Sequence, residues 1–171
     1  RANYYNNSQH FNDHWAPELT RAIRWDRFNG GQFWADEARQ SAGITVTSTN
    51  PRDGFGDLYT ARELAMELER AGWSTSLLAR YGSSWYEDET QYDLIISLLP
   101  TFDPDQRPDI PVVVAWVRNW PTRWAEQLTK GSFDVIAIAS QGFTSHLPPG
   151  SRALVAPAAT NPDRFRPGPP S

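Results

Sequence analysis

The sequence predicts an α/β domain built on a doubly wound, mostly parallel, Rossmann-like sheet. Short and nearly continuous apolar runs recur along the chain and are bounded by proline, glycine and aspartate. Segments whose apolar residues have helical spacing alternate with these runs. Continuous apolar runs are typical of strands buried on both faces of a parallel sheet. Strands that alternate with helices are joined by the right-handed crossovers of a doubly wound sheet.

Residues 1–43 differ in character from the rest and are expected to form a helical or irregular appendage. The segment "APELTRAIRWDRF" (16–28) has the pattern of an amphipathic helix, in which Pro17 is acceptable in the first turn. Residues 32–43 are expected to form a second short helix that ends at Gly43. The apolar side chains expected near one face of the first helix are Leu19, Ile23 and Phe28.

The Rossmann-like domain is expected to span residues 44–167. Between its first two strands, residues 57–72 have apolar side chains at helical spacing, and Gly72 is well placed as a C-terminal cap. Residues 121–131 are a second expected helix, with proline at its start and glycine at its end. The strands are expected at residues 44–49, 74–80, 92–100, 110–117, 133–140 and 152–159. Loops or single turns, followed by a C-terminal linker, are expected at residues 81–91, 101–109 and 168–171.

Composition and charge argue against several classes of protein. The chain has 171 residues and a formal net charge of −4, which makes it a poor match to a general nucleic-acid binder. It contains no cysteine, so disulfides and thiol nucleophiles are excluded, and its three histidines give little support to a metal site. Neither a signal-peptide pattern nor an apolar run long enough to span a membrane is present. We therefore expect a cytoplasmic protein without a transmembrane segment.

The stretch "NPRDGFGD" (50–57) lies where an open parallel sheet usually binds its ligand. It follows the first expected strand and leads into the first expected helix, whose N-terminal N–H groups are free to bind. Glycines there permit a positive φ and a close approach of a ligand to the main chain. The stretch is not a full G-x-G-x-x-G motif, because Tyr59 stands at the third glycine position. A tight turn in which Asp57 caps the helix is the alternative interpretation.

The order of several motifs resembles the N-terminal, acceptor-side domain of GT-B glycosyltransferases of the family 4, or group 1, type. The stretch "LVAPAATNPDRFRP" (154–167) is similar to the segment that closes this domain, where a strand ends in a turn of the type Asn-x-(Asp/Glu)-x-Phe-x-Pro. Residues 50–80 resemble the first glycine loop, first helix and second strand of the family. Residues 93–100 and 112–140 resemble its later strands, so the similarity covers about residues 44–167.

The resemblance implies an enzyme that moves a hexosyl or deoxyhexosyl group from a nucleotide sugar to a glycan or other acceptor. In such enzymes the reaction takes place in a cleft between two Rossmann-like domains. The C-terminal domain binds most of the donor, usually without a bound metal. The implied partner is therefore a donor-binding domain of the same polypeptide, no cofactor is expected, and this chain is expected to be inactive alone.

The candidate site residues follow the ends of expected strands. Asp57 is the candidate catalytic base toward an acceptor hydroxyl. Arg118 follows a buried strand and suits a phosphate or carboxylate clamp, with a surface ion pair as its alternative role. Trp120 suits stacking on a sugar ring, with packing inside the domain as the alternative. The residues expected to bind the acceptor or substrate are Gly54, Phe55, Gly56, Arg118, Asn119, Trp120 and Ser140.

Two other functions stay open at this point. The aromatic-rich segment 1–42 favours a non-catalytic interaction module that docks on a partner or self-associates. Its contact residues would be Trp15, Trp25 and Trp34. The glycine stretch also fits another kind of nucleotide- or phosphate-binding Rossmann protein.

Overall fold

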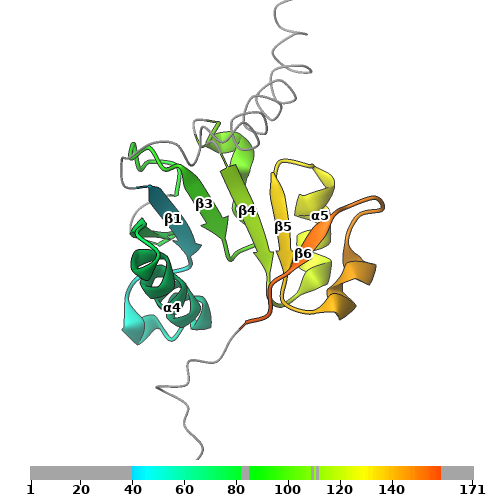
Figure 1. Ribbon diagram of the computed structural model, residues 1–171, viewed down its shortest axis with the longest axis horizontal. Helices are drawn as coiled ribbons and strands as arrows, with labels where there is room; N and C mark the ends of the chain where they lie inside the picture. Colours follow the sequence, from blue (N-terminus) through cyan, green and yellow to red (C-terminus); the bar gives the residue numbers. More distant parts are fainter. Residues whose placement is uncertain (1–39, 82–84, 109, 111, 159–171) are drawn as a thin grey trace, which may run out of the picture.

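The computed structural model describes residues 40–81, 85–108, 110 and 112–158, and the expected linker 168–171 lies outside them. The described residues form an all-parallel sheet with the strand order β2-β1-β3-β4-β5-β6 (Figure 1). This confirms the α/β, doubly wound, Rossmann-like fold class. The strands are β1 (Ser41–Val46), β2 (Ser74–Ala79), β3 (Leu94–Ser97), β4 (Val112–Val117), β5 (Val135–Ile138) and β6 (Ala153–Val155).

Strand β1 begins three residues before its expected start, so the segment from Ser41 to Gly43 belongs to the sheet and not to the appendage. The N–H and the hydroxyl of Ser41 donate to Asp93 Oδ2 at 2.8 and 3.0 Å, which holds the start of the strand beside β3. Gly43 does not end a helix. A Cβ at this position would lie 2.8 Å from Leu78 Cδ1, so glycine makes room for the neighbouring strand β2. The rest of the expected appendage, residues 1–39, lies outside the described part of the chain.

Two α-helices and three 3-10 helices connect the strands in the described part of the chain. Helix α4 (Gly56–Arg70) crosses from β1 to β2 and buries Leu58, Ala61 and Ala65 at helical spacing. Helix α5 (Pro121–Thr129) begins at the expected proline and crosses from β4 to β5. None of these helices is long and apolar enough to cross a membrane. The 3-10 helices are η1 (Pro51–Asp53), η2 (Pro104–Gln106) and η3 (Gln141–His146).

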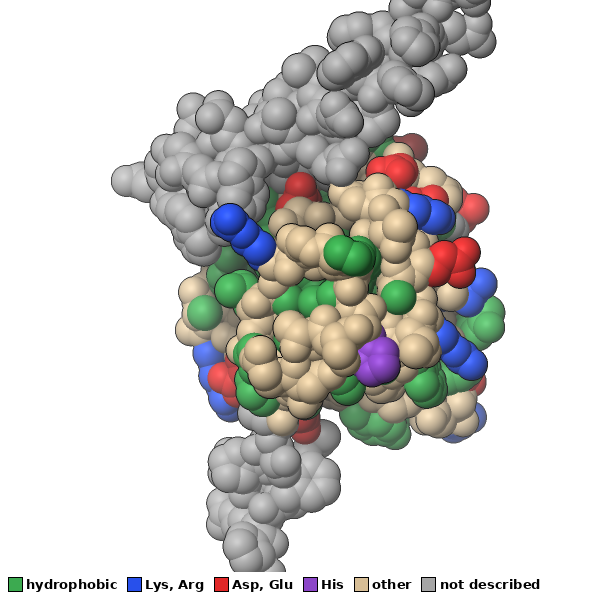
Figure 2. Space-filling model, turned by 90° about the vertical axis from the view of Figure 1, so that its right-hand side faces the viewer, with side chains coloured by type: hydrophobic (Ala, Val, Ile, Leu, Met, Phe, Trp, Pro, Cys, Tyr) green, Lys and Arg blue, Asp and Glu red, His purple; other side chains and the backbone are tan. Residues whose placement is uncertain are grey.

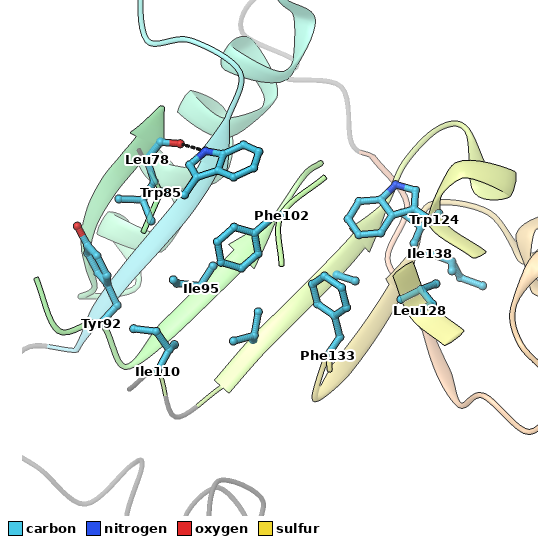
Figure 3. Close-up of a cluster of buried hydrophobic side chains, with 13 residues drawn as sticks. Leu78, Trp85, Tyr92, Ile95, Phe102, Ile110, Trp124, Leu128, Phe133 and Ile138 are labelled. Carbon is cyan, nitrogen blue, oxygen red and sulfur yellow. Dashed lines mark hydrogen bonds between the residues drawn. The ribbon is translucent and has the colours of Figure 1, made fainter. Parts of the chain in front are cut away.

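Each face of the sheet carries its own apolar cluster. On one face α4 packs over β1 and β2, and Ile44 is buried beneath it. On the other face Trp124 of α5 joins aromatic side chains from the connections between strands (Figure 3). The rings of Trp85 and Phe102 in this cluster meet edge to face with centroids 5.6 Å apart. The Trp85 ring N–H donates to the Leu78 carbonyl at 2.8 Å, which anchors the connection to β2.

The strand order reverses between β1 and β3, because the chain passes outward from β1 to β2 and returns to β3 on the other side. In doubly wound sheets, ligands bind beyond the carboxyl ends of the strands at such a reversal. Thr45 and Ser97 are buried partners on these two strands, with their hydroxyl oxygens 3.1 Å apart. The Leu98 N–H donates to Thr45 Oγ1 at 3.2 Å, so this polar pair is satisfied within the protein. The reversal lies beside the loop that follows β1.

Asp88 makes the stability of the fold sensitive to acid. Its carboxylate accepts hydrogen bonds from the Thr90 N–H at 2.9 Å and the Tyr92 hydroxyl at 2.8 Å. Hydrogen bonding from Thr90 lowers the pKa of Asp88 most, and the Tyr92 hydroxyl and the charge of Arg107 act in the same direction. A carboxyl whose pKa is lowered by folding contributes stability above its unfolded pKa, and this contribution is lost as the pH falls.

We therefore expect Asp88→Asn to reduce the free energy of unfolding at pH 7 by less than about 1 kcal/mol, because the carboxylate is partly exposed and screened. The difference between the two proteins should shrink as the pH is lowered from about 5 to 3. Urea unfolding at several pH values measures it. A difference that grows with acid would contradict this role of Asp88.

Candidate functional site

The glycine loop between β1 and α4 leaves its main chain open. Gly54 has a φ of +71°, in the left-handed region that glycine favours, and Gly56 is the first residue of α4. A Cβ added at either glycine would meet no other atom within 4 Å. Residues 51–56 are all exposed. The described residues therefore leave open space beside both glycines, next to the N-terminus of α4.

The remainder of the loop is held by its own side chains. The Ser48 hydroxyl donates to Asp53 Oδ2 at 2.5 Å, and the Asn50 side-chain amide donates to Asp53 Oδ1 at 2.9 Å. Asn50 Oδ1 accepts from the Arg52 N–H at 3.1 Å and so caps η1. These bonds hold the residues that precede Gly54, and they explain how an exposed, glycine-containing turn has a defined shape.

Asp57 joins the end of β1 to the start of α4. Its Oδ2 accepts the Thr47 N–H at 2.6 Å. The N-cap of α4 is Phe55, which makes no side-chain cap hydrogen bond, so the interpretation of Asp57 as a helix cap is wrong. The carboxylate is half-buried in the first turn of the helix, where the helix dipole favours a negative charge.

Arg118 comes from the end of β4 to the same place. Its Nη1 donates to Thr60 Oγ1 at 2.6 Å, in the first turns of α4. Its guanidinium carbon lies 5.9 Å from the centroid of the Trp116 ring, while its buried Nε has no hydrogen-bond partner. Burial lowers the pKa of Arg118, and the nearby negative charge of Asp57 opposes this shift. Asp57 and Arg118, expected from separate stretches of sequence, therefore lie at one edge of the sheet.

Exposed aromatic rings follow the same carboxyl edge. The rings of Phe55 and Tyr81 lie 6.2 Å apart, after β1 and β2 respectively. Tyr59 is exposed in the first turn of α4, and Trp120 is 55% exposed after β4. Arg123 lies over the Trp120 ring at 5.0 Å, which holds the indole against α5. Large exposed aromatic side chains are typical of contact surfaces, because they offer much area at a low entropic cost.

The backbone of Trp120 is strained. Its φ of 45° and ψ of 54° make it the only described non-glycine residue with a positive φ, and it precedes Pro121 as the N-cap of α5 without a side-chain cap bond. A non-glycine residue in this region costs about 1–2 kcal/mol. The contact with Arg123 offsets part of that cost, and a strained residue at this edge is consistent with a functional position.

We expect Trp120→Gly to be more stable than Trp120→Ala by about 1 kcal/mol, because glycine adopts a positive φ without steric cost. Both variants remove the ring, so the comparison isolates the backbone. Urea unfolding of the two proteins measures the difference. An alanine variant as stable as the glycine variant would contradict the strain at this position.

The two remaining expected residues, Asn119 and Ser140, follow β4 and β5 at the same edge, and neither has a side-chain hydrogen bond to Asp57 or Arg118. Asn119 is exposed beside Trp120. Ser140 follows β5, and its hydroxyl accepts the Gly142 N–H at 3.3 Å as the cap of η3. Because β5 is separated from β1 by β3 and β4, Ser140 is farther along the edge from the glycine loop than Arg118 is.

Comparison with known proteins assigns no family and no function to this chain. No family model, curated protein or solved structure matches the chain. Within the residues that the structure describes, no three histidine or carboxylate side chains gather as they would to hold a metal ion. The groups that the candidate site offers a ligand are the Asp57 carboxylate, the Arg118 guanidinium, exposed aromatic rings and the N-terminal turn of α4.

A hollow of about 360 Å³ lies on the α5 face, away from the glycine loop, and none of the expected site residues line it. Arg80 and Lys130 line it together with Tyr86, whose hydroxyl accepts the Asp103 N–H at 2.8 Å. Burial raises the pKa of Tyr86. These residues come from separate connections and from the end of α5, so no local sequence pattern would have predicted that they meet. The same is true of Thr60, the partner of Arg118 across 58 positions of sequence.

Proposed function

We propose that this chain is the acceptor-side domain of a glycosyltransferase that uses a nucleotide-sugar donor. In this proposal, a hexosyl or deoxyhexosyl group is moved to a glycan or other acceptor that binds at the carboxyl edge of the sheet. The observation that carries the proposal is the meeting of the open glycine loop with Asp57 and Arg118 at that edge. A donor-binding domain that follows in the same polypeptide completes the proposed enzyme.

Asp57 has the geometry of a fixed base. Its Oδ2 is held by the Thr47 N–H, and its Oδ1 makes no hydrogen bond to the described residues. In the proposed reaction this carboxylate accepts the proton of an acceptor hydroxyl, whose oxygen bonds to the anomeric carbon of the sugar. The nucleoside diphosphate leaves with the electron pair of the broken bond.

Arg118 suits an anionic group of a substrate. Thr60 fixes one of its terminal nitrogens, and the half-buried position weakens the competition from water. A guanidinium held in this way attracts a phosphate or carboxylate more strongly than one in bulk solvent does. Trp120 and Phe55, which are exposed after β4 and β1 at the same edge, offer flat apolar faces to the ring of a sugar.

The path of the chain supports a second domain facing this edge. All six described strands are parallel, so β6 ends at the same edge as β1 and β4. The Trp116 ring N–H donates to the Ala156 carbonyl at 3.0 Å, so the chain leaves the sheet beside the ring that Arg118 covers. Residues that follow β6 therefore start next to the candidate site.

The experiment that tests the proposal is a nucleotide-release assay on the full-length polypeptide. The protein is incubated with uridine-, guanosine- and thymidine-diphosphate sugars together with a mixture of glycan acceptors, and the released nucleoside diphosphate is measured. We expect release from at least one donor, dependent on an acceptor, and no release by residues 1–171 alone. Absence of release from every donor by the folded full-length protein would contradict the proposal.

A further inference from the structure

One face of the sheet presents a row of apolar side chains that no described helix covers. Trp116 on β4, Ala137 on β5 and Leu154 on β6 are successive register partners and therefore point to the same side. Val114 and Val135 form a second such pair beside them. Successive side chains of a strand point to opposite faces of the sheet. Residues that alternate with these five belong to the apolar cluster that contains Trp124 of α5, called here the α5-side cluster, so the five side chains lie on the opposite, α4 side.

Helix α4 covers the other half of this face. It packs over β1 and β2, and Val114 and Trp116 lie at the margin of its cluster. In Figure 1 α4 lies beside β1, whereas β4 and β5 are seen with no described helix in front of them. Exposure varies along the row: Ala137 is buried and Trp116 is half-buried beside Arg118, whereas Leu154 at the far end is 65% exposed. Figure 2 looks onto the β6 edge of the sheet, at right angles to this face, and most charged side chains lie toward the margin of that view.

All-parallel sheets occur almost only with both faces covered, because their strands are apolar on both sides. Among the described residues, α4 covers β1 and β2 on this face, and no helix covers the part of the same face from β4 to β6. A cover must therefore come from chain outside the described residues or from another molecule.

The chain itself carries a suitable segment. Residues 16–28 have the pattern of an amphipathic helix, with Leu19 and Ile23 one turn apart on its apolar side. The other segment outside the described residues, 159–171, contains four prolines and one large apolar residue, Phe165, so it is a poor helix former. The N-terminal segment is thus the better occupant.

The connection is long enough for this placement. Eleven residues, 29–39, separate residue 28 from Gln40, where the described chain enters β1, and this connection spans up to about 40 Å when extended. The distance across the sheet from β1 to β6 is four strand spacings, or about 19 Å. The segment therefore reaches the uncovered face without displacing α4.

We propose that residues 16–28 form an amphipathic helix that packs Leu19 and Ile23 against the row formed by Trp116, Ala137 and Leu154. This helix is the second cover of the α4-side face. The inference is independent of the proposed enzymatic function, since it depends only on the sheet and on the N-terminal segment.

Disulfide trapping tests this inference cleanly, because the chain has no cysteine of its own. Ile23→Cys is combined with Leu154→Cys in the 171-residue chain, which is oxidised mildly at low protein concentration. We expect most of the protein to form an intramolecular disulfide, seen as faster migration on a non-reducing gel and a mass lower by two hydrogens. The matched control pairs Ile23→Cys with Met66→Cys, an exposed position on the outer side of α4, and should give at least fivefold less.

Two further proteins separate docking from random contact. Adding Leu19→Asp to the Ile23→Cys, Leu154→Cys protein should lower the disulfide yield at least fivefold, because it places a charge in the proposed apolar contact. The single variant Leu154→Cys should stay monomeric. Equal yields with Met66→Cys or with Leu19→Asp would overturn the proposal. A disulfide dimer of the single variant would instead identify a second copy as the occupant, and would also overturn it.

Discussion

Asp57→Asn is expected to lower the rate of sugar transfer by the full-length protein about 10²–10⁴-fold, the usual contribution of a general base. The asparagine side-chain oxygen can still accept the Thr47 N–H, so the hydrogen bond that links the end of β1 to the first turn of α4 is preserved. The substitution therefore removes the charge and the basicity while leaving the local fold. Nucleotide release, corrected for the folded fraction measured by circular dichroism, gives the comparison.

Asp53→Asn is the matched control for this prediction. Asp53 lies in the same loop, but its carboxylate is engaged by Ser48 and Asn50 and holds the turn. We expect this variant to retain activity within a few-fold of the unchanged protein. A wild-type rate for Asp57→Asn, or an equal loss in both variants, would mean that the carboxylates only shape the loop.

Trp124→Ala is expected to reduce the free energy of unfolding by about 3–5 kcal/mol. Trp124 is fully buried in the α5-side cluster, and its ring lies 5.9 Å from that of Phe133. Its removal leaves a large cavity between α5 and β4, the strand that Arg118 follows. Because domains of this size are stable by only about 5–15 kcal/mol, much of that margin would be lost. Urea unfolding followed by circular dichroism measures the change.

Two controls accompany this variant. Trp120→Ala removes an exposed tryptophan four residues earlier and should cost less than about 1 kcal/mol. Trp124→Phe keeps the aromatic contact and removes an indole N–H that is buried without a hydrogen-bond partner, so it should recover more than half of the loss. A Trp124→Ala protein as stable as Trp120→Ala would contradict the position of α5 on the sheet.

The central strands and both helices were predictable because local patterns specify them. The apolar runs of β3, β4 and β5 and the helical spacing in α4 each depend on a few consecutive residues. The start of β1 was not predictable in this way. The segment Ser41–Gly43 has only small side chains and no β-branched residue, and its strand geometry depends on Asp93 and Leu78, which are distant in sequence.

The candidate site was predictable only in outline. Parallel strands end at one edge, so residues that follow β1 and β4 were expected to lie on the same side of the sheet. The bond from Arg118 to Thr60, the tie from Asp57 to Thr47 and the positive φ of Trp120 depend on tertiary structure. No local sequence pattern predicts these three features. A carboxylate next to an expected helix start fits a helix cap equally well, and the sequence does not show that Asp57 accepts the Thr47 N–H instead.

Gly56→Ala gives the most direct test of a ligand site at the open glycine loop. Gly56 has no positive φ, and a Cβ there meets no other atom, so the variant should be as stable as the unchanged protein or up to about 1 kcal/mol more stable. The added methyl group projects from the first turn of α4, where the proposed ligand approaches the main chain. Met66→Ala, on the exposed side of the same helix, is the control.

The measurement is nucleotide release by the full-length protein, set against urea unfolding of each variant. We predict that Gly56→Ala loses at least tenfold in the rate of release with undiminished stability, while Met66→Ala keeps the full rate. A Gly56→Ala protein that is folded and fully active would contradict a ligand bound against this loop.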